Sequence, residues 1–165
     1  MKYSKVDYFE IVNGTNIGVS LYTQGCERHC KGCFNEAAWD LEGGNDYTIE
    51  VRDDIVNACC RPGIKRFSVV GGEPLLERNK EELIALCSLV KEANPDISIW
   101  VYTGDTYENV KDEWNDLFEP FVDVLVDGPF ILEQRDITLP FRGSTNQRLV
   151  DIKKTIEKGE IVLYE

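Results

Sequence analysis

Short apolar runs alternate with helical patterns along the chain. The apolar runs are rich in β-branched and aromatic residues, and they predict four strands at 17–22 (IGVSLY), 66–70 (RFSVV), 97–102 (ISIWVY) and 122–126 (VDVLV). Apolar residues at helical spacing predict two helices, one carrying Val51, Ile55, Ala58 and Cys59 and the next carrying Leu83, Leu86, Cys87 and Val90. A third, shorter helix is indicated by Val110, Trp114, Leu117 and Phe118.

The ends of these elements carry recognisable capping residues. Thr48 suits the N-cap of the first helix, and Pro62 suits its end. Asn79, with Glu82 three residues later, resembles a capping box at the start of the second helix. After Asn146 the pattern is weak, although 161–164 (IVLY) is compatible with a last strand.

Strand followed by helix, repeated, implies right-handed crossovers and a mostly parallel sheet of the α/β class. The chain has 165 residues and contains no repeat or Pro/Ser-rich linker, so residues 1–165 are expected to form a single domain. Sheets of this class bind ligands at the carboxyl ends of their strands. We therefore expect the functional residues in the segments that directly follow the strands.

The acidic net charge of the chain argues against nucleic acid as a partner. The formal net charge is -12, from 30 acidic and 18 basic residues, and it would repel a phosphate backbone. The N-terminus lacks a basic start followed by an apolar run, and no apolar stretch approaches the ~20 residues that span a bilayer. The sequence predicts a soluble, cytoplasmic protein that binds neither nucleic acid nor membrane, and in that compartment clustered cysteines favour a metal site.

Three of the six cysteines stand in one loop directly after the first predicted strand. Cys26, Cys30 and Cys33 have the spacing C-x3-C-x2-C, and three thiolates so placed can hold three corners of a 4Fe-4S cube. The fourth iron is then left open for a substrate, as in a catalytic zinc site that lacks one protein ligand. The alternatives are a zinc knuckle, for which His29 within the same loop is an awkward fourth ligand, or three unrelated thiols.

The remaining cysteines fall on predicted helices. Cys59 and Cys87 lie on apolar faces and are expected to pack in the core, while Cys60 has no evident role.

Further polar groups follow the other strands. Gly71, Gly72 and Glu73 precede Pro74, and the two glycines would let the backbone approach a ligand while the carboxylate accepts hydrogen bonds from an ammonium. Thr103 and Asp127 follow the third and fourth strands, where they would face a ligand or only form turns. Arg142, in the segment RGSTNQ, suits a carboxylate or ribose contact.

The cysteine spacing and the GGEP motif resemble the radical S-adenosylmethionine superfamily. The resemblance implies a partial (β/α) barrel, in which the amino and carboxylate groups of S-adenosylmethionine chelate the open iron of the 4Fe-4S cluster. It also implies that an electron from the cluster cleaves the sulfonium to a 5'-deoxyadenosyl radical. Gly71, Gly72 and Glu73 would hold the cofactor's amino group.

More specific segments are similar to the activating proteins of anaerobic ribonucleoside-triphosphate reductase. They are DYFEIVNG at 7–14, GCFN at 32–35 followed by Trp39, LVDGPF at 125–130 and RGSTNQ at 142–147. This resemblance runs from about Tyr3 to Gln147. It implies an oxidoreductase that forms a glycyl radical on the large reductase subunit and takes its electron from an external donor.

The chain departs from these patterns at two places. Gly32 stands where many superfamily members have an aromatic residue against the adenine, so Phe34 and the backbone of Gly32 and Cys33 are expected to take that role. Ala37 and Ala38 replace two hydroxyl residues of the family, which leaves any role of those hydroxyls unfilled. Two alternatives stay open, namely an activase of another glycyl-radical enzyme such as pyruvate formate-lyase, and a non-catalytic metal-binding module.

Overall fold

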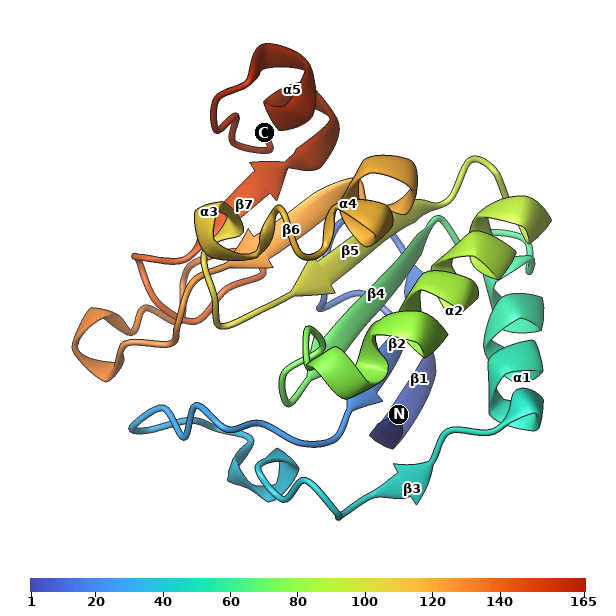
Figure 1. Ribbon diagram of the computed structural model, residues 1–165, viewed down its shortest axis with the longest axis horizontal. Coiled ribbons are helices and arrows are strands. Elements are labelled where there is room, and N and C mark those ends of the chain that lie inside the picture. The colour runs from blue at the N-terminus through green and yellow to red at the C-terminus, as the bar shows by residue number, and fades with distance from the viewer.

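One sheet of seven strands organises the molecule (Figure 1). The computed structural model describes residues 1–165. The strands are β1 (Lys2–Glu10), β2 (Gly18–Thr23), β3 (Asn45–Asp46), β4 (Arg66–Gly71), β5 (Ser98–Tyr102), β6 (Val124–Asp127) and β7 (Arg148–Asp151). The helices are α1 (Ile49–Cys59), α2 (Lys80–Ala93), α3 (Tyr107–Val110), α4 (Asn115–Phe121) and α5 (Ile152–Lys158). Short 3-10 turns are η1 (Glu36–Ala38), η2 (Glu77–Asn79) and η3 (Leu132–Gln134).

The sheet is mixed and open. Its strand order is β3-β1-β2-β4-β5-β6-β7, and the four central strands β2, β4, β5 and β6 run parallel. These are the four strands that the apolar runs predict, so the α/β class and the mostly parallel arrangement are confirmed. β1, β3 and β7 are antiparallel to their neighbours and occupy the two sides of the sheet.

Alternation along the strands gives the sheet two different faces. One face, which we call the helix face, packs against α1, α2 and α4 through a cluster of 24 buried residues that includes Leu21, Val69 and Val101. Figure 1 shows these helices on the same side of the sheet. The opposite face, which we call the pocket face, carries a smaller cluster of Trp100, Val124, Val126 and Leu149. The apolar core therefore lies under the helices, and the pocket face is left for polar residues and loops.

Two helix starts differ in how they are capped. The Oγ1 atom of Thr48 accepts a hydrogen bond from Val51 N at 3.4 Å, which confirms the N-cap of α1. The capping box expected at Asn79 is wrong, because Asn79 makes no side-chain cap and instead donates to the Pro74 carbonyl at 3.1 Å. Glu82 pairs with the N-terminal ammonium of Met1 at 2.8 Å. Asn79 therefore fixes the loop that leads into α2 rather than the helix itself.

Three further sequence expectations need correction. The single short helix around Trp114 is two helices, α3 and α4, separated by a turn at 111–114. The last strand expected at 161–164 is wrong, because this segment forms only one isolated bridge, Val150 with Leu163. The sequence did not predict β1, β3, β7 or α5. The extra strands extend the sheet at both sides without altering its parallel centre.

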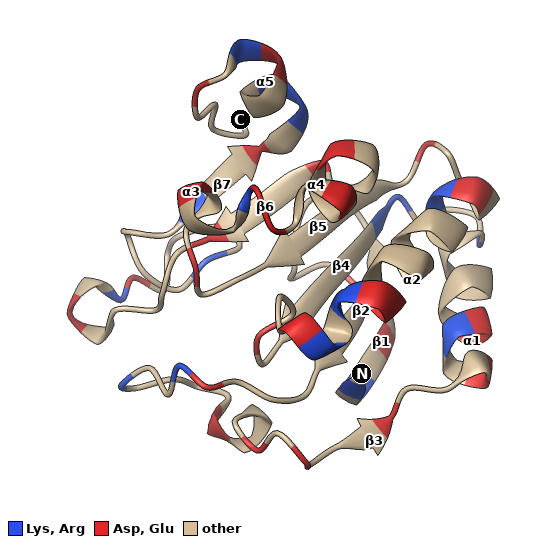
Figure 2. Ribbon diagram, viewed as in Figure 1, with Lys and Arg blue, Asp and Glu red and all other residues tan.

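Charged residues are nearly absent from the four central strands of the sheet. Figure 2 shows Lys, Arg, Asp and Glu mainly on the helices and connecting loops. Two exceptions, Arg66 and Asp127, are fully buried at opposite ends of their strands. No helix combines the length and the apolar character needed to cross a bilayer.

Candidate active site

A pocket of about 530 Å³ lies on the pocket face at the carboxyl ends of the parallel strands. The strands supply its floor through Tyr22, Val70, Tyr102 and Val126. Its walls come from the segments that follow β2 and β6, which both lie at the arrowhead end of the parallel strands in Figure 1. This is the edge of the sheet at which the sequence predicts a ligand site.

Cys26, Cys30 and Cys33 all line this pocket. The loop that carries them is tied back to itself by hydrogen bonds from Gly25 N to the Ala38 carbonyl, at 2.9 Å, and from Cys26 N to the Trp39 carbonyl, at 3.3 Å. No three His, Cys, Asp or Glu side chains converge on a point that could hold one metal ion. Ligands of a cubic cluster each bind a different iron, so they need to face one space rather than one point. Three cysteines that line one pocket fit that requirement.

His29 takes part in packing within the same loop. Its ring stacks on Trp39 with centroids 4.4 Å apart and an interplanar angle of 18°. Its backbone is left-handed, with φ at 48°. His29 is the only histidine of the chain, and its stacking on Trp39 stabilises the cysteine loop.

Gly71 and Gly72 also line the pocket, and the lack of a side chain at each lets other backbone segments approach closely. Gly71 has φ at 109°, and a Cβ there would collide with the backbone of Thr23. A Cβ at Gly72 would collide with the Gly25 carbonyl oxygen and come within 3.0 Å of the Ala38 oxygen. Gly71 therefore lets the end of β4 lie directly against β2, and Gly72 lets the following loop lie directly against the cysteine loop.

Glu73 joins three of the loops around the pocket. Its Oε2 accepts hydrogen bonds from Gly104 N at 2.8 Å and from Arg28 Nε at 3.1 Å, and its Oε1 accepts one from Leu75 N at 3.1 Å. Arg28 continues the connection with an ion pair to Asp105 at 2.6 Å. We call Arg28, Glu73 and Asp105 the loop clamp.

The sequence placed Asp105 after the third strand with Thr103 and Gly104, but it did not predict a role for Arg28 or the contact between Arg28 and Asp105. Their contacts join residues 77 positions apart, which no local pattern can indicate. The only available signal was their position, since Arg28 stands between two cysteines and Asp105 directly follows the segment that contains Thr103.

Two buried polar atoms in the pocket lining lack a hydrogen-bond partner, Tyr102 Oη and Arg142 Nε. Burial raises the pKa of the Tyr102 phenol, so this group is a protonated hydrogen-bond donor at neutral pH. Unpaired buried donors are rare because each costs about 1–3 kcal/mol. Both donors therefore fit a site that binds a polar ligand, and Arg142 lies at the edge of the sheet where the sequence predicts that site. Tyr102 was not foreseen.

The other predicted site residues are divided between the pocket and its surroundings. Thr103 and Phe34 line the pocket, although the Phe34 side chain is 96% exposed. Gly32 lies behind the lining, where a Cβ would come within 2.8 Å of Leu132.

Asp127 is fully buried outside the pocket. Its oxygens accept hydrogen bonds from Arg148 Nε at 3.0 Å and Tyr107 N at 2.8 Å, so the carboxylate joins β6, β7 and α3. The cofactor contact that the sequence predicts for Asp127 is therefore wrong, because the side chain is buried away from the pocket.

The cysteines on helices are remote from the pocket. Burial raises the pKa of Cys59 and of Cys87 to about 12, so both remain neutral thiols at physiological pH. Metal ligation requires thiolate, and both residues belong to the core under the helices. Cys60 is exposed and its Sγ lies 3.6 Å from the Ala93 carbonyl.

Comparison with known proteins identifies the family of this chain. Residues 12–150 match the model of a 4Fe-4S single cluster domain. The chain is 40% identical to the anaerobic ribonucleoside-triphosphate reductase-activating protein of Vibrio cholerae, over 89% of this chain and 96% of that protein. Identity is 36% to the protein of the same name from Haemophilus influenzae, with the same coverage, and 32% to that of Enterobacteria phage T4, over 90% of this chain and 93% of the relative. This chain belongs to the family of anaerobic ribonucleoside-triphosphate reductase-activating proteins, which the sequence resemblance predicted.

Proposed function

We propose that this chain activates an anaerobic ribonucleoside-triphosphate reductase by generating a glycyl radical on it, with one 4Fe-4S cluster and S-adenosylmethionine as cofactors. The printed names of the relatives and the match to a single-cluster domain support the reductase and the cluster. The observation that carries the proposal is the pocket itself. It brings together the three cysteines, the Gly-Gly-Glu loop and two unpartnered buried donors at the carboxyl edge of the sheet.

The cluster would be held by Cys26, Cys30 and Cys33. These are the only cysteines in the pocket lining, so they leave one iron without a protein ligand. The loop after β4, Tyr102 and Arg142 line the same pocket, so they would be the groups available beside that open position.

The second cofactor would be held by groups of matching polarity. The Gly71–Glu73 loop suits the methionine ammonium, whereas the Arg142 guanidinium suits the carboxylate. Tyr102 supplies a neutral hydrogen-bond donor from the pocket floor, and Phe34 offers an aromatic surface for the adenine. When bound, the two cofactors supply a 5'-deoxyadenosyl radical that takes a hydrogen atom from glycine.

The chain's own contribution is to position these groups and to leave the pocket accessible to a protein. Residues 1–165 would act as one radical S-adenosylmethionine domain whose open sheet is a partial (β/α) barrel. The mixed sheet has seven strands and does not surround the pocket, so a segment of the reductase has to cover it and exclude water. An external donor would supply the electron.

The test is electron paramagnetic resonance of the anaerobic mixture of this chain and the reductase from the same source. We expect a doublet glycyl-radical signal only when a reductant and S-adenosylmethionine are both present. A reductase with Ala at the radical glycine should give no signal. The proposal fails if the wild-type reductase stays silent while a formate-lyase from the same source acquires the radical. Iron and sulfide analysis of the anaerobically prepared chain separates a cluster from a zinc module.

A further inference from the structure

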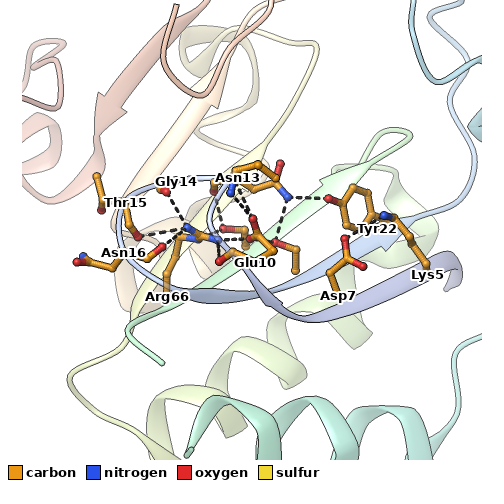
Figure 3. Close-up of polar contacts among 12 residues, drawn as sticks. Lys5, Asp7, Glu10, Asn13, Gly14, Thr15, Asn16, Tyr22 and Arg66 are labelled. Atoms are coloured by element: carbon orange, nitrogen blue, oxygen red, sulfur yellow. Dashed lines mark hydrogen bonds and ion pairs between the residues drawn. The ribbon is translucent and has the colours of Figure 1, made fainter. Parts of the chain in front are cut away.

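A buried arginine holds the loop between β1 and β2 in place (Figure 3). Arg66 is fully buried, and its Nη1 donates to the carbonyls of Gly14 at 2.7 Å and Asn16 at 2.9 Å. Its Nη2 forms an ion pair with Glu10, and its Nε donates to Ser68 Oγ at 2.8 Å. Buried ion pairs contribute little net stability but fix position, because breaking one leaves an uncompensated charge. Arg66 therefore determines where residues 10–16 lie.

Glu10 transmits this fixation to the pocket. Its Oε2 accepts hydrogen bonds from the backbone N–H groups of Val12 and Asn13. Both of these residues line the pocket. The Asn13 Nδ2 donates to Tyr22 Oη at 2.8 Å and to Ser20 Oγ at 3.2 Å, which sets the orientation of its amide. The network of Figure 3 thus fixes residues 11–13, of which Val12 and Asn13 form a wall of the pocket and Ile11 adjoins that wall in the chain.

The groups that this wall presents are left without partners in the chain. Ile11 is 67% exposed and Val12 is 63% exposed, although both are apolar. Both Asn13 Nδ2 contacts are within the network, and no hydrogen bond of the chain uses Asn13 Oδ1. The wall therefore offers apolar surface and one amide acceptor beside the pocket.

Half of the large exposed apolar side chains come from two segments that each contribute a residue to this pocket. Four of the eight large ones, Phe9, Ile11, Val12 and Phe34, come from the end of β1, the following loop and the cysteine loop. Val12 and Phe34 line the pocket from these two different segments. Apolar residues gathered at one site on a protein surface mark binding sites, whereas singly scattered ones do not.

We infer that residues 11–13, which we call the docking ridge, bind the glycine-bearing segment of the partner reductase as it enters the pocket. This inference rests on the proposed function. A glycine has no side chain to recognise, so binding has to use its backbone and its neighbours. The Asn13 amide oxygen accepts a backbone N–H from that segment, and Ile11 and Val12 pack against its neighbouring apolar side chains. The ridge is continuous with the pocket into which the glycine has to be brought.

The test compares Ile11→Ser with Ile49→Ser in the cluster-loaded chain. Ile49 is a matched control, since it is 63% exposed and begins α1 outside the pocket lining. Both changes are at exposed positions, so both variants should fold. Three quantities are measured anaerobically, namely the affinity for the reductase by titration calorimetry, the affinity for S-adenosylmethionine, and the glycyl-radical yield.

We expect Ile11→Ser to weaken reductase binding at least about tenfold while S-adenosylmethionine binds as in the wild type, and Ile49→Ser to bind both normally. The inference is overturned if Ile11→Ser binds the reductase like the wild type, if Ile49→Ser is weakened equally, or if Ile11→Ser loses affinity for S-adenosylmethionine. A wild-type complex that forms without a radical would contradict the proposed function alone, because binding is read separately.

Discussion

The Nε atom of Arg28 lies 3.1 Å from Oε2 of Glu73, which joins the cysteine loop to the loop after β4. Glu73 is only 5% exposed, and its carboxylate oxygens accept hydrogen bonds from Arg28 Nε and from the backbone donors Gly104 N and Leu75 N. The same guanidinium reaches Asp105 after β5. The loop clamp thus sets the relative position of three loops that each contribute to the pocket.

Replacing Arg28 by Gln should therefore impair both stability and cofactor binding. We expect the free energy of unfolding to fall by about 1–3 kcal/mol, because a buried carboxylate loses its charged partner. Affinity for S-adenosylmethionine should fall as the loop after β4 moves. Chemical denaturation and equilibrium binding measure the two effects. Arg52→Gln is the control, because Arg52 is paired with the exposed Asp53 on α1 and should cost less than about 1 kcal/mol. Equal effects of both changes would contradict a role for the clamp.

Replacing Gly72 by Ala should disturb the cluster as well as the second cofactor. The added Cβ would collide with the Gly25 carbonyl oxygen and push the cysteine loop away from the loop after β4. Iron content and cluster absorption should fall together with S-adenosylmethionine affinity. Gly63→Ala is the control, because its Cβ meets no atom within 4 Å and only the backbone strain at φ 88° remains. An intact cluster with reduced cofactor affinity would instead indicate that Gly72 faces the cofactor alone.

Tyr102→Phe should affect stability and binding in opposite directions. Removing a buried hydroxyl that has no partner should leave the cofactor-free chain equally stable or more stable by about 1 kcal/mol. If the hydroxyl donates to the cofactor, the same change should weaken S-adenosylmethionine binding about tenfold. Tyr47 provides a matched control, since its hydroxyl is also buried and unpartnered but lies outside the pocket. Tyr47→Phe should leave binding unchanged, and a Tyr102→Phe variant with wild-type affinity would remove Tyr102 from the site.

Cys30→Ala and Cys87→Ala should separate ligation from packing. Cys30→Ala should lose the cluster and the reductive cleavage of S-adenosylmethionine, because Cys30 lines the pocket as one of the three proposed cluster ligands. Cys87→Ala should keep its iron and lose stability, by a few kcal/mol at most for a small core side chain, since Cys87 is fully buried under the helices. Iron analysis and thermal unfolding measure the two outcomes. Full iron content and activity in Cys30→Ala would show that the ligand assignment is wrong.

The parallel centre of the fold could be predicted because each of its strands is buried on both faces. Such strands read as continuous apolar runs, as in 97–102 and 122–126. β1 was not predictable in the same way, because it is largely half-buried or exposed and its register shifts twice, between Tyr3 and Lys5 and between Asp7 and Glu10. Those irregularities interrupt the alternation that identifies a strand. β7 has only four residues, and its identity depends on pairing with β6.

Only part of the candidate site could be predicted from the sequence. The cysteines and the Gly-Gly-Glu loop could be predicted because their spacing is local and directly follows strands. Arg28, Arg66 and Tyr102 could not, since their roles depend on partners or orphaned groups that only tertiary folding defines. Asp127 is the opposite case. Its position at the end of β6 suggested a ligand contact, but its carboxylate instead pairs with Arg148 on the neighbouring antiparallel strand.

The central claim is that a hydrogen atom passes from a glycine of the reductase to a radical formed in this pocket. The most direct test uses reductase labelled with glycine deuterated at its α-carbon, mixed anaerobically with this chain, a reductant and S-adenosylmethionine. Mass spectrometry should find one deuterium in the 5'-deoxyadenosine product, in an amount that matches the glycyl radical seen by electron paramagnetic resonance. Unlabelled 5'-deoxyadenosine formed alongside a full radical signal would contradict direct transfer from the glycine.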